Sequence, residues 1–164
     1  MNVGLVVDII KETDRNWRFI IESPLHDEIK YQAGQLIQLR VESPTHGELV
    51  RSYSLSSWPD GTNKLEIIVT YLDGGKMSHY LFNEVKVGDE VWFRGPMGIF
   101  TLPDNLKERS IYMVSTGSGI SPFRSMINWL HTNKIEYKEI KLFFGTRTQD
   151  DLLYKGEMID WHDK

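Results

Sequence analysis

The feature that most constrains the fold is a short apolar run that leads into a glycine-rich turn and then into a helix. The apolar residues are Ile111–Val114, the small residues Ser115–Gly119 follow, and a helix is expected to open at Ser121-Pro122. Glycines let the backbone approach a ligand closely, and the amides at a helix start attract negative charge. This order of buried strand, turn and helix is typical of a site for a phosphate-bearing nucleotide.

The residues after this turn predict a parallel βαβ unit over 104–164. Strands are expected at 111–114 and 140–145, with a helix at 122–131 capped by Ser121 and a further helix start near Asp150. The apolar residues of the first helix fall on one face, at Phe123, Met126, Ile127 and Leu130. Doubly wound nucleotide folds use five or six strands, so two strands leave an open sheet edge. We therefore expect a further segment or a partner to cover that edge.

The first part of the chain, 1–103, predicts a small antiparallel barrel. Apolar residues such as Ile37, Leu39 and Val41 alternate with polar ones, which indicates strands with one buried face. Turn signals separate the candidate strands, as expected of a barrel. The candidate strands are Gly4–Lys11, Trp17–Glu22, Leu36–Glu42, Val50–Ser56, Leu65–Tyr71 and Glu90–Arg94.

Composition excludes several classes of function. The net charge is −4, and no basic run suggests nucleic acid. No apolar stretch is long enough to span a bilayer, and the N-terminus lacks the features of a signal peptide, so a cytoplasmic location is expected. The chain has no cysteine, hence no disulfide, thiolate nucleophile or cysteine-bound iron–sulfur cluster. Its five histidines are scattered, and we expect no metal site.

The run Arg51-Ser52-Tyr53-Ser54 lies on a predicted strand. With a period of two, Arg51 and Tyr53 share one face, and the two serines share the other. An aromatic ring can lie against a flat cofactor, an arginine can pair with its phosphate, and a serine can reach a ring nitrogen. The alternative interpretation, favoured for this run alone, is a half-buried tyrosine with an arginine at its rim.

A second motif, Gly74-Gly75-Lys76-Met77-Ser78, leads into a short helix that continues to Leu81. The amides of Lys76, Met77 and Ser78 would be free at the helix N-terminus and able to hold a pyrophosphate, with the Ser78 hydroxyl assisting. An ordinary glycine turn before a capped helix explains this motif equally well.

Two further motifs favour structural interpretations when each is taken alone. Arg94-Gly95-Pro96-Met97-Gly98 predicts a tight turn, after which Phe100 can pack where two domains meet. Arg147 follows the second parallel strand, at the end of an open sheet where ligands bind. A lone arginine at such a place is more often a solvated charge, although it can also reach a nucleotide phosphate.

Taken together and in this order, the four motifs resemble those of the ferredoxin–NADP reductase superfamily. The sequences Gly-Gly-Lys-Met-Ser-x-Tyr-Leu, Val-Gly-Asp and Arg-Gly-Pro-x-Gly are similar to the cytochrome b5 reductase and oxygenase-reductase branches. Ser-Thr-Gly-Ser-Gly-Ile-Ser-Pro-Phe-Arg-Ser-Met is more similar to the ferredoxin reductase branch. The resemblance implies a six-stranded FAD-binding β-barrel followed by part of a Rossmann-like α/β domain for NAD(P)H.

The resemblance also implies roles for individual residues. Arg51 would pair with the flavin phosphates, Tyr53 would lie against the flavin ring, and Ser54 would hydrogen-bond it, which makes Tyr53 and Ser54 the candidate catalytic residues. The candidate cofactor-binding residues are Arg51, Ser52, Tyr53, Ser54, Gly75, Lys76, Met77, Ser78, Thr116, Gly117, Ser118, Gly119, Ser121, Pro122 and Arg147. Family members continue with further βα units, a Cys-Gly-Pro-type motif and a C-terminal segment near the flavin, none of which is present here.

The implied activity is hydride transfer from NAD(P)H to FAD, followed by electron transfer to a protein acceptor. Ferredoxin, flavodoxin, a cytochrome and the iron–sulfur component of an oxygenase stay open as acceptors, as do the choice between NADH and NADPH and the oligomeric state. Three alternatives also stay open. The chain would be a non-catalytic or split flavin-binding module, a flavin or ferric-chelate reductase, or a protein that binds FMN in place of FAD.

Overall fold

The β-rich first part of the chain forms a six-stranded antiparallel sheet in the computed structural model, which describes residues 1–162. The strand order is β4-β3-β6-β1-β2-β5, and every pairing is antiparallel. The edge strands come together at one bridge, between Leu55 and Ile67. The strands are β1 (Asn2–Thr13), β2 (Asn16–Glu22), β3 (Leu36–Ser43), β4 (Gly47–Ser54), β5 (Lys64–Thr70) and β6 (Glu90–Met97).

Alternating apolar residues of these strands form the main core. Ile37, Leu39 and Val41 of β3 are each at most 1% exposed, as their spacing predicts. Helix α1 (Lys76–Asn83) covers part of this core with Met77 and Leu81. Burial of so many branched and aromatic side chains gives the sheet unit a hydrophobic core of its own.

The tight turn expected at Gly95-Pro96 is wrong, because both residues lie inside β6. The pairing of β3 with β6 shifts between Leu36 and Gln38, so β6 carries an extra residue there. Proline has no amide hydrogen to give to a ladder, and a bulge accommodates it within a strand. The chain turns only after β6, at Gly98, whose φ is +112°.

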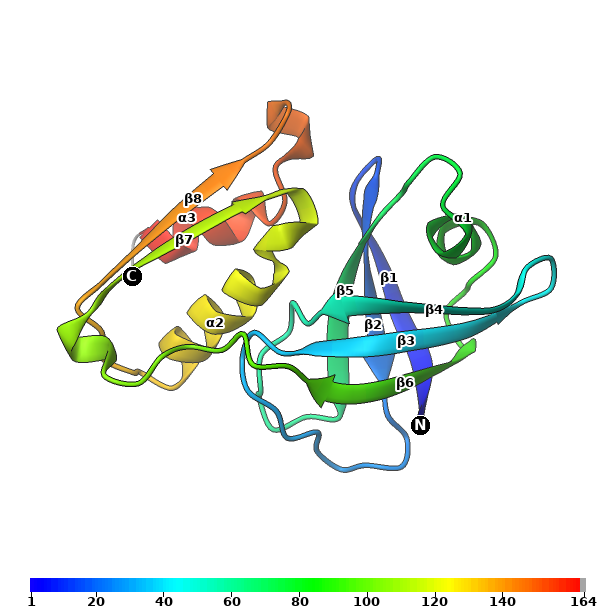
Figure 1. The fold of residues 1–164 in the computed structure, drawn as a ribbon, viewed down its shortest axis with the longest axis horizontal. Coiled ribbons are helices and arrows are strands. Elements are labelled where there is room, and N and C mark those ends of the chain that lie inside the picture. The colour runs from blue at the N-terminus through cyan, green and yellow to red at the C-terminus, as the bar shows by residue number, and fades with distance from the viewer. Residues whose placement is uncertain (163–164) are drawn as a thin grey trace.

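The second part of the chain forms the predicted parallel unit, and Figure 1 shows it beside the antiparallel sheet. Strands β7 (Ser110–Thr116) and β8 (Glu139–Gly145) pair in parallel, with α2 (Ser121–Thr132) between them in the chain. The final helix, α3 (Lys155–His162), follows, while Asp163 and Lys164 lie outside the described residues. The predicted fold class, an antiparallel β domain followed by a parallel α/β domain, is confirmed.

The last helix begins later than the sequence indicates. A single 3₁₀ turn occupies 149–151, near the predicted start at Asp150, and α3 begins at Lys155. Between them Leu153 and Tyr154 are buried, at 0% and 2% exposure. Their insertion between the two units interrupts the helical path.

Apolar contacts hold the two units together. Ile68 of β5 packs in one cluster with Ile120, Leu153 and Tyr154. The Phe100 ring meets that of Phe123 on α2 edge-on, with centroids 5.7 Å apart, as expected of a residue between domains. No helix among residues 1–162 is long and apolar enough to cross a membrane.

Candidate flavin and nucleotide groove

A groove of about 470 Å³ lies where the two units meet near the end of β4. Its walls come from the edge of the antiparallel sheet, the start of α1, and the turn before α2. Three motifs that are far apart in the sequence therefore share one cavity. The residues that line it are Arg51, Ser52, Tyr53, Ser54, Ile68, Thr70, Leu72, Gly75, Lys76, Met77, Ser78, Ser118, Gly119 and Ser121.

The first wall is the end of β4. All four residues of the run Arg51–Ser54 line the groove, although alternation places them on two faces of the strand. This is possible because β4 is an edge strand, so its free side presents backbone as well as side chains. Burial raises the pKa of the Tyr53 phenol to about 12, against the opposing influence of Arg51. The Arg51 guanidinium is exposed and donates a hydrogen bond to the Val50 carbonyl at 2.7 Å.

The second wall is the N-terminus of α1. The amide of His79 donates to the Gly75 carbonyl at 2.9 Å, so the amides of Lys76, Met77 and Ser78 lie in the first turn. A helix leaves the amides of that turn unpaired, and they attract an anion. A Cβ at Gly75 would lie 2.8 Å from Ser78 Oγ and 2.9 Å from Leu72 Cβ, so the chain needs glycine there.

The Ser78 hydroxyl is engaged with the loop that precedes α1. It accepts a hydrogen bond from the Leu72 amide at 3.1 Å, and the carbonyls of Gly75 and Leu72 lie 3.1 and 3.3 Å from it. Ser78 is 5% exposed. The hydroxyl therefore orders the loop, while the backbone amide of the same residue belongs to the helix start.

The third wall is the turn between β7 and α2. The chain passes through a 3₁₀ turn at Gly117–Ile120 directly into the helix, and Gly117 has φ +51°. Ser118, Gly119 and Ser121 line the groove, whereas Thr116, Gly117 and Pro122 hold the turn without lining it. The prediction that Ser121 caps the helix is wrong. Ser121 is already helical, and its hydroxyl donates to the Ser118 carbonyl at 2.8 Å.

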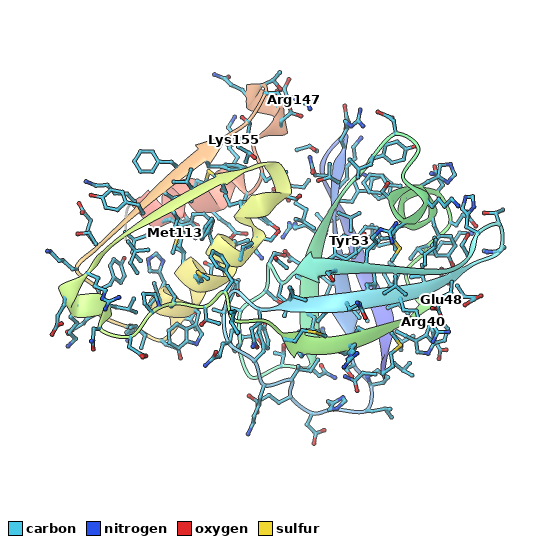
Figure 2. The ribbon with its side chains drawn as sticks, viewed as in Figure 1. Arg40, Glu48, Tyr53, Met113, Arg147 and Lys155 are labelled. Carbon is cyan, nitrogen blue, oxygen red and sulfur yellow. The ribbon has the colours of Figure 1, made fainter. Side chains whose placement is uncertain are left out.

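Arg147 lies apart from the groove. Figure 2 shows it beyond the carboxyl end of β8, away from Tyr53 on β4. It is exposed and does not belong to the residues that line the groove. The structure thus joins the motifs at 51–54, 75–78 and 118–121, while the 94–98 motif does not line the groove and Arg147 lies on the outer end of the parallel unit.

Sequence reasoning missed the contribution to the groove of β5 and of the residues directly after it. Ile68, Thr70 and Leu72 line it between the β4 and α1 walls. Ile68 is 3% exposed although it alternates with Ile67 and Val69, which point into the core of the sheet. An isoleucine on the outer face of a strand is the available signal that something covers that face.

The groove has the chemistry that a dinucleotide flavin requires. A half-buried aromatic ring can lie against a flat ring system, and a hydroxyl and backbone groups stand beside it. Unpaired amides at the start of α1 suit a pyrophosphate, and Arg51 adds a positive charge. The turn of the parallel unit stands opposite, where a second nucleotide can reach the same cavity.

Two family models match this chain. The family model described as "Oxidoreductase FAD-binding domain" matches residues 6–102, and that described as "Oxidoreductase NAD-binding domain" matches residues 113–164. The first match spans more than half of the chain, and together the two cover both structural units.

Two curated relatives are similar to most of this chain. NADH oxidoreductase HCR of Escherichia coli (strain K12) is 30% identical over 149 residues, which are 91% of this chain and 44% of the relative. Ferredoxin–NADP reductase B of Sorangium cellulosum is 33% identical over 128 residues, which are 78% of this chain and 51% of the relative. The chain thus spans about half the length of these relatives.

Solved structures share the fold. The flavohem-like FAD/NAD-binding domain of nitric oxide dioxygenase from Vibrio cholerae superimposes with a TM-score of 0.88 at 24% identity, over 99% of this chain and 69% of that one. A ferredoxin–NADP⁺ reductase from Neisseria gonorrhoeae with bound FAD and NADP gives 0.80 at 22% identity, over 96% and 62%. Together with the family match, these findings show that the chain belongs to the FAD-binding oxidoreductases of the ferredoxin–NADP reductase superfamily.

Proposed function

We propose that this chain is the flavin-binding part of an electron-transfer reductase that passes a hydride from NAD(P)H to FAD and then electrons to a protein acceptor. The groove shared by β4, the α1 N-terminus and the turn before α2 is the observation that carries this proposal. Bound FAD would supply the redox chemistry, accepting two electrons as hydride and releasing them singly. The protein binds and orients the two nucleotides.

Each wall has its own task. Arg51 pairs with the flavin phosphates, Tyr53 lies against the flavin ring, and Ser54 donates a hydrogen bond to it. The amides of Lys76, Met77 and Ser78 hold the pyrophosphate. Ser118, Gly119 and Ser121 face the nicotinamide nucleotide, and Thr116, Gly117 and Pro122 shape that turn.

The acceptor is a redox protein in this proposal. Relatives of the chain include a ferredoxin–NADP reductase, the electron transfer component of a 2-halobenzoate 1,2-dioxygenase, and an NADH–cytochrome b5 reductase. Ferredoxin, flavodoxin, a cytochrome and an oxygenase iron–sulfur component are therefore the acceptors to assay. Activity toward ferric chelates or free flavin, with weak retention of FAD, would instead indicate a flavin or ferric-chelate reductase.

Flavin binding and nicotinamide turnover can be tested separately. The visible spectrum after incubation with FAD and gel filtration reports binding, and anaerobic bleaching by NADH or NADPH reports hydride transfer. We expect Arg51→Gln to weaken FAD binding, while Arg109→Gln, at an exposed arginine outside the groove, leaves it unchanged. A protein that stays colourless with FAD would refute the proposal, and full flavin reduction by a Ser54→Ala variant would refute the role of Ser54.

A split flavin module is the second candidate, and the bare face of the parallel sheet favours it. Tyr112, Val114 and Phe143 are 59%, 71% and 54% exposed on the side of β7 and β8 away from α2. Parallel sheets are ordinarily covered on both faces. FAD binding without NAD(P)H oxidation, restored by a second polypeptide, would support this candidate over an active reductase.

A further inference from the structure

A buried charged cluster lies between the two units, outside the residues that line the groove. Its centre is Arg124 of α2, whose side chain is 7% exposed. Its Nη1 donates to the Ser56 carbonyl at 2.8 Å and to Glu66 Oε1 at 2.9 Å. Its Nε and Nη2 donate to the two carboxylate oxygens of Glu157 at 2.8 and 2.7 Å. The guanidinium also lies 4.4 Å from the centre of the Tyr154 ring.

These partners come from both units. Ser56 follows Ser54 of the β4 wall by two residues, and Glu66 belongs to β5. Arg124 itself lies one helical turn beyond Ser121, which lines the opposite wall, and Glu157 belongs to α3. One guanidinium therefore joins the β4 wall to the turn wall, with α3 bound to the same group.

Glu66, whose carboxylate accepts a hydrogen bond from Arg124, is itself held in place by other groups of the antiparallel unit. Glu66 Oε1 also accepts a hydrogen bond from the Ser56 hydroxyl at 2.7 Å. Its other oxygen lies 3.3 Å from Nη1 of Arg18, and Arg18 pairs with Glu12 at 2.9 Å. Arg124 is thus anchored to a preorganised group and not to a mobile surface side chain.

Arginine suits this place for a geometric reason. Its planar fork carries five donors, so it can bind one carboxylate with two nitrogens and a carbonyl with the third. A lysine ammonium keeps the charge, but its donors all lie on one atom and cannot span these partners. Buried ion pairs contribute little net stability compared with apolar packing, so the cluster is better explained by the geometry it imposes.

We propose that Arg124 is a positioning residue that sets the separation of the β4 wall from the turn before α2. The separation itself is a property of this chain. Its consequence, the placement of the nicotinamide nucleotide against the flavin, rests on the proposed function.

The separation can be measured without any cofactor, because the chain has no cysteine to interfere with labelling. Lys86→Cys and Lys138→Cys introduce exposed thiols, one on each unit, for nitroxide labels and pulsed electron–electron double resonance. We expect one narrow distance distribution in the doubly labelled parent. Arg124→Gln should at least double its width, and Arg124→Lys should do the same despite its retained charge.

Two further variants make the result decisive. Glu66→Gln weakens the contact that crosses to the antiparallel unit while Arg124 stays in place. It should also broaden the distribution, which keeps the test available if Arg124→Gln fails to fold. Arg40→Gln is the matched control, because Arg40 pairs with Glu48 at 2.8 Å on the β3–β4 hairpin, away from the groove (Figure 2). An unchanged distribution in the folded Arg124 and Glu66 variants would overturn the proposal. Full rescue by Arg124→Lys would overturn the requirement for the fork.

The consequence for the reaction has a separate readout. FAD affinity of Arg124→Gln should stay within about twofold of the parent, because the residues assigned to FAD lie on the antiparallel unit. The limiting rate of flavin reduction by NAD(P)H should fall at least tenfold, as expected when reacting groups are misplaced. If the parent binds no FAD, the proposed function fails while the distance measurement still tests Arg124. A broadened distribution with an unchanged reduction rate would overturn the link to catalysis alone.

Discussion

The hydroxyl of Ser78 has two possible roles in the groove: it binds a phosphate of the ligand, or it orders the loop before α1. The sequence assigns this group to a phosphate, whereas in the structure it binds the backbone of the Leu72–Gly75 loop. Ser78→Ala leaves the partly buried amide of Leu72 without its hydrogen-bond partner, and an unpaired amide costs up to about 1–3 kcal/mol. Alanine returns about 0.5 kcal/mol through its higher helix propensity. We therefore expect the free energy of unfolding to fall by about 0.5–2.5 kcal/mol.

Urea denaturation of the ligand-free protein, followed by far-ultraviolet circular dichroism, measures this change. Ser52→Ala is the matched control, because Ser52 is an exposed serine on the same groove and should change stability by less than about 0.5 kcal/mol. The reasoning would be refuted by a Ser78→Ala variant with unchanged stability. If that variant also bound FAD more weakly, the hydroxyl would belong to the ligand and not to the loop.

Three other predictions concern the core and the groove. The buried Ser125 hydroxyl has no hydrogen-bond partner within residues 1–162, so Ser125→Ala should leave the melting temperature unchanged or raise it, and a clear fall would contradict this. Phe19 is 1% exposed, and Phe19→Ala should lower the free energy of unfolding by about 3–5 kcal/mol in urea titrations; a loss below about 1 kcal/mol would be inconsistent with its burial. Burial raises the pKa of Tyr53 to about 12, so its folded form holds the proton more tightly than the unfolded chain, whose tyrosine pKa is about 10. Stability should therefore be full below about pH 10 and fall as the pH rises toward 12, and Tyr53→Phe should reduce that slope. Burial also raises the pKa values of Tyr31 and Tyr154, which keep a residual slope, and identical slopes in the variant and the parent would refute the assignment.

Local periodicity predicted the elements of this fold because each pattern reports burial within one strand or helix. Ile37, Leu39 and Val41 alternate in the sequence and are buried together in the structure. We did not predict the extra residue in β6, because a Gly-Pro pair such as Gly95-Pro96 is typical of a turn. Only the pairing of β6 with β3 shows that a bulge accommodates the extra residue within the strand. The cap assigned to Ser121 was wrong for a related reason, since a 3₁₀ turn already supplies the helical start.

The groove was predictable in its parts but not as a whole. Each wall has a local signature, namely an aromatic strand end, a glycine before a helix, and a small-residue turn. Arg124 has no local signature, because its hydrogen-bond partners lie 33 to 68 positions away in the chain. The pattern of apolar residues along α2 also does not distinguish a buried arginine from a solvated one. Long-range pairing of this kind is set by the packing of the two units.

The groove is supported unequally by the two units. The walls assigned to FAD belong to β4, β5 and α1, which share one large core cluster with the rest of the antiparallel sheet. The wall assigned to the nicotinamide nucleotide belongs to a two-stranded parallel sheet that exposes Tyr112, Val114 and Phe143. In the proposed function, flavin binding depends on the first unit and hydride transfer on both, so a change in the covering of that face should act on turnover before it acts on FAD affinity. Under the positioning role proposed for Arg124, such a change would reach the flavin side through this residue, since it joins α2 and α3 to Ser56 and Glu66.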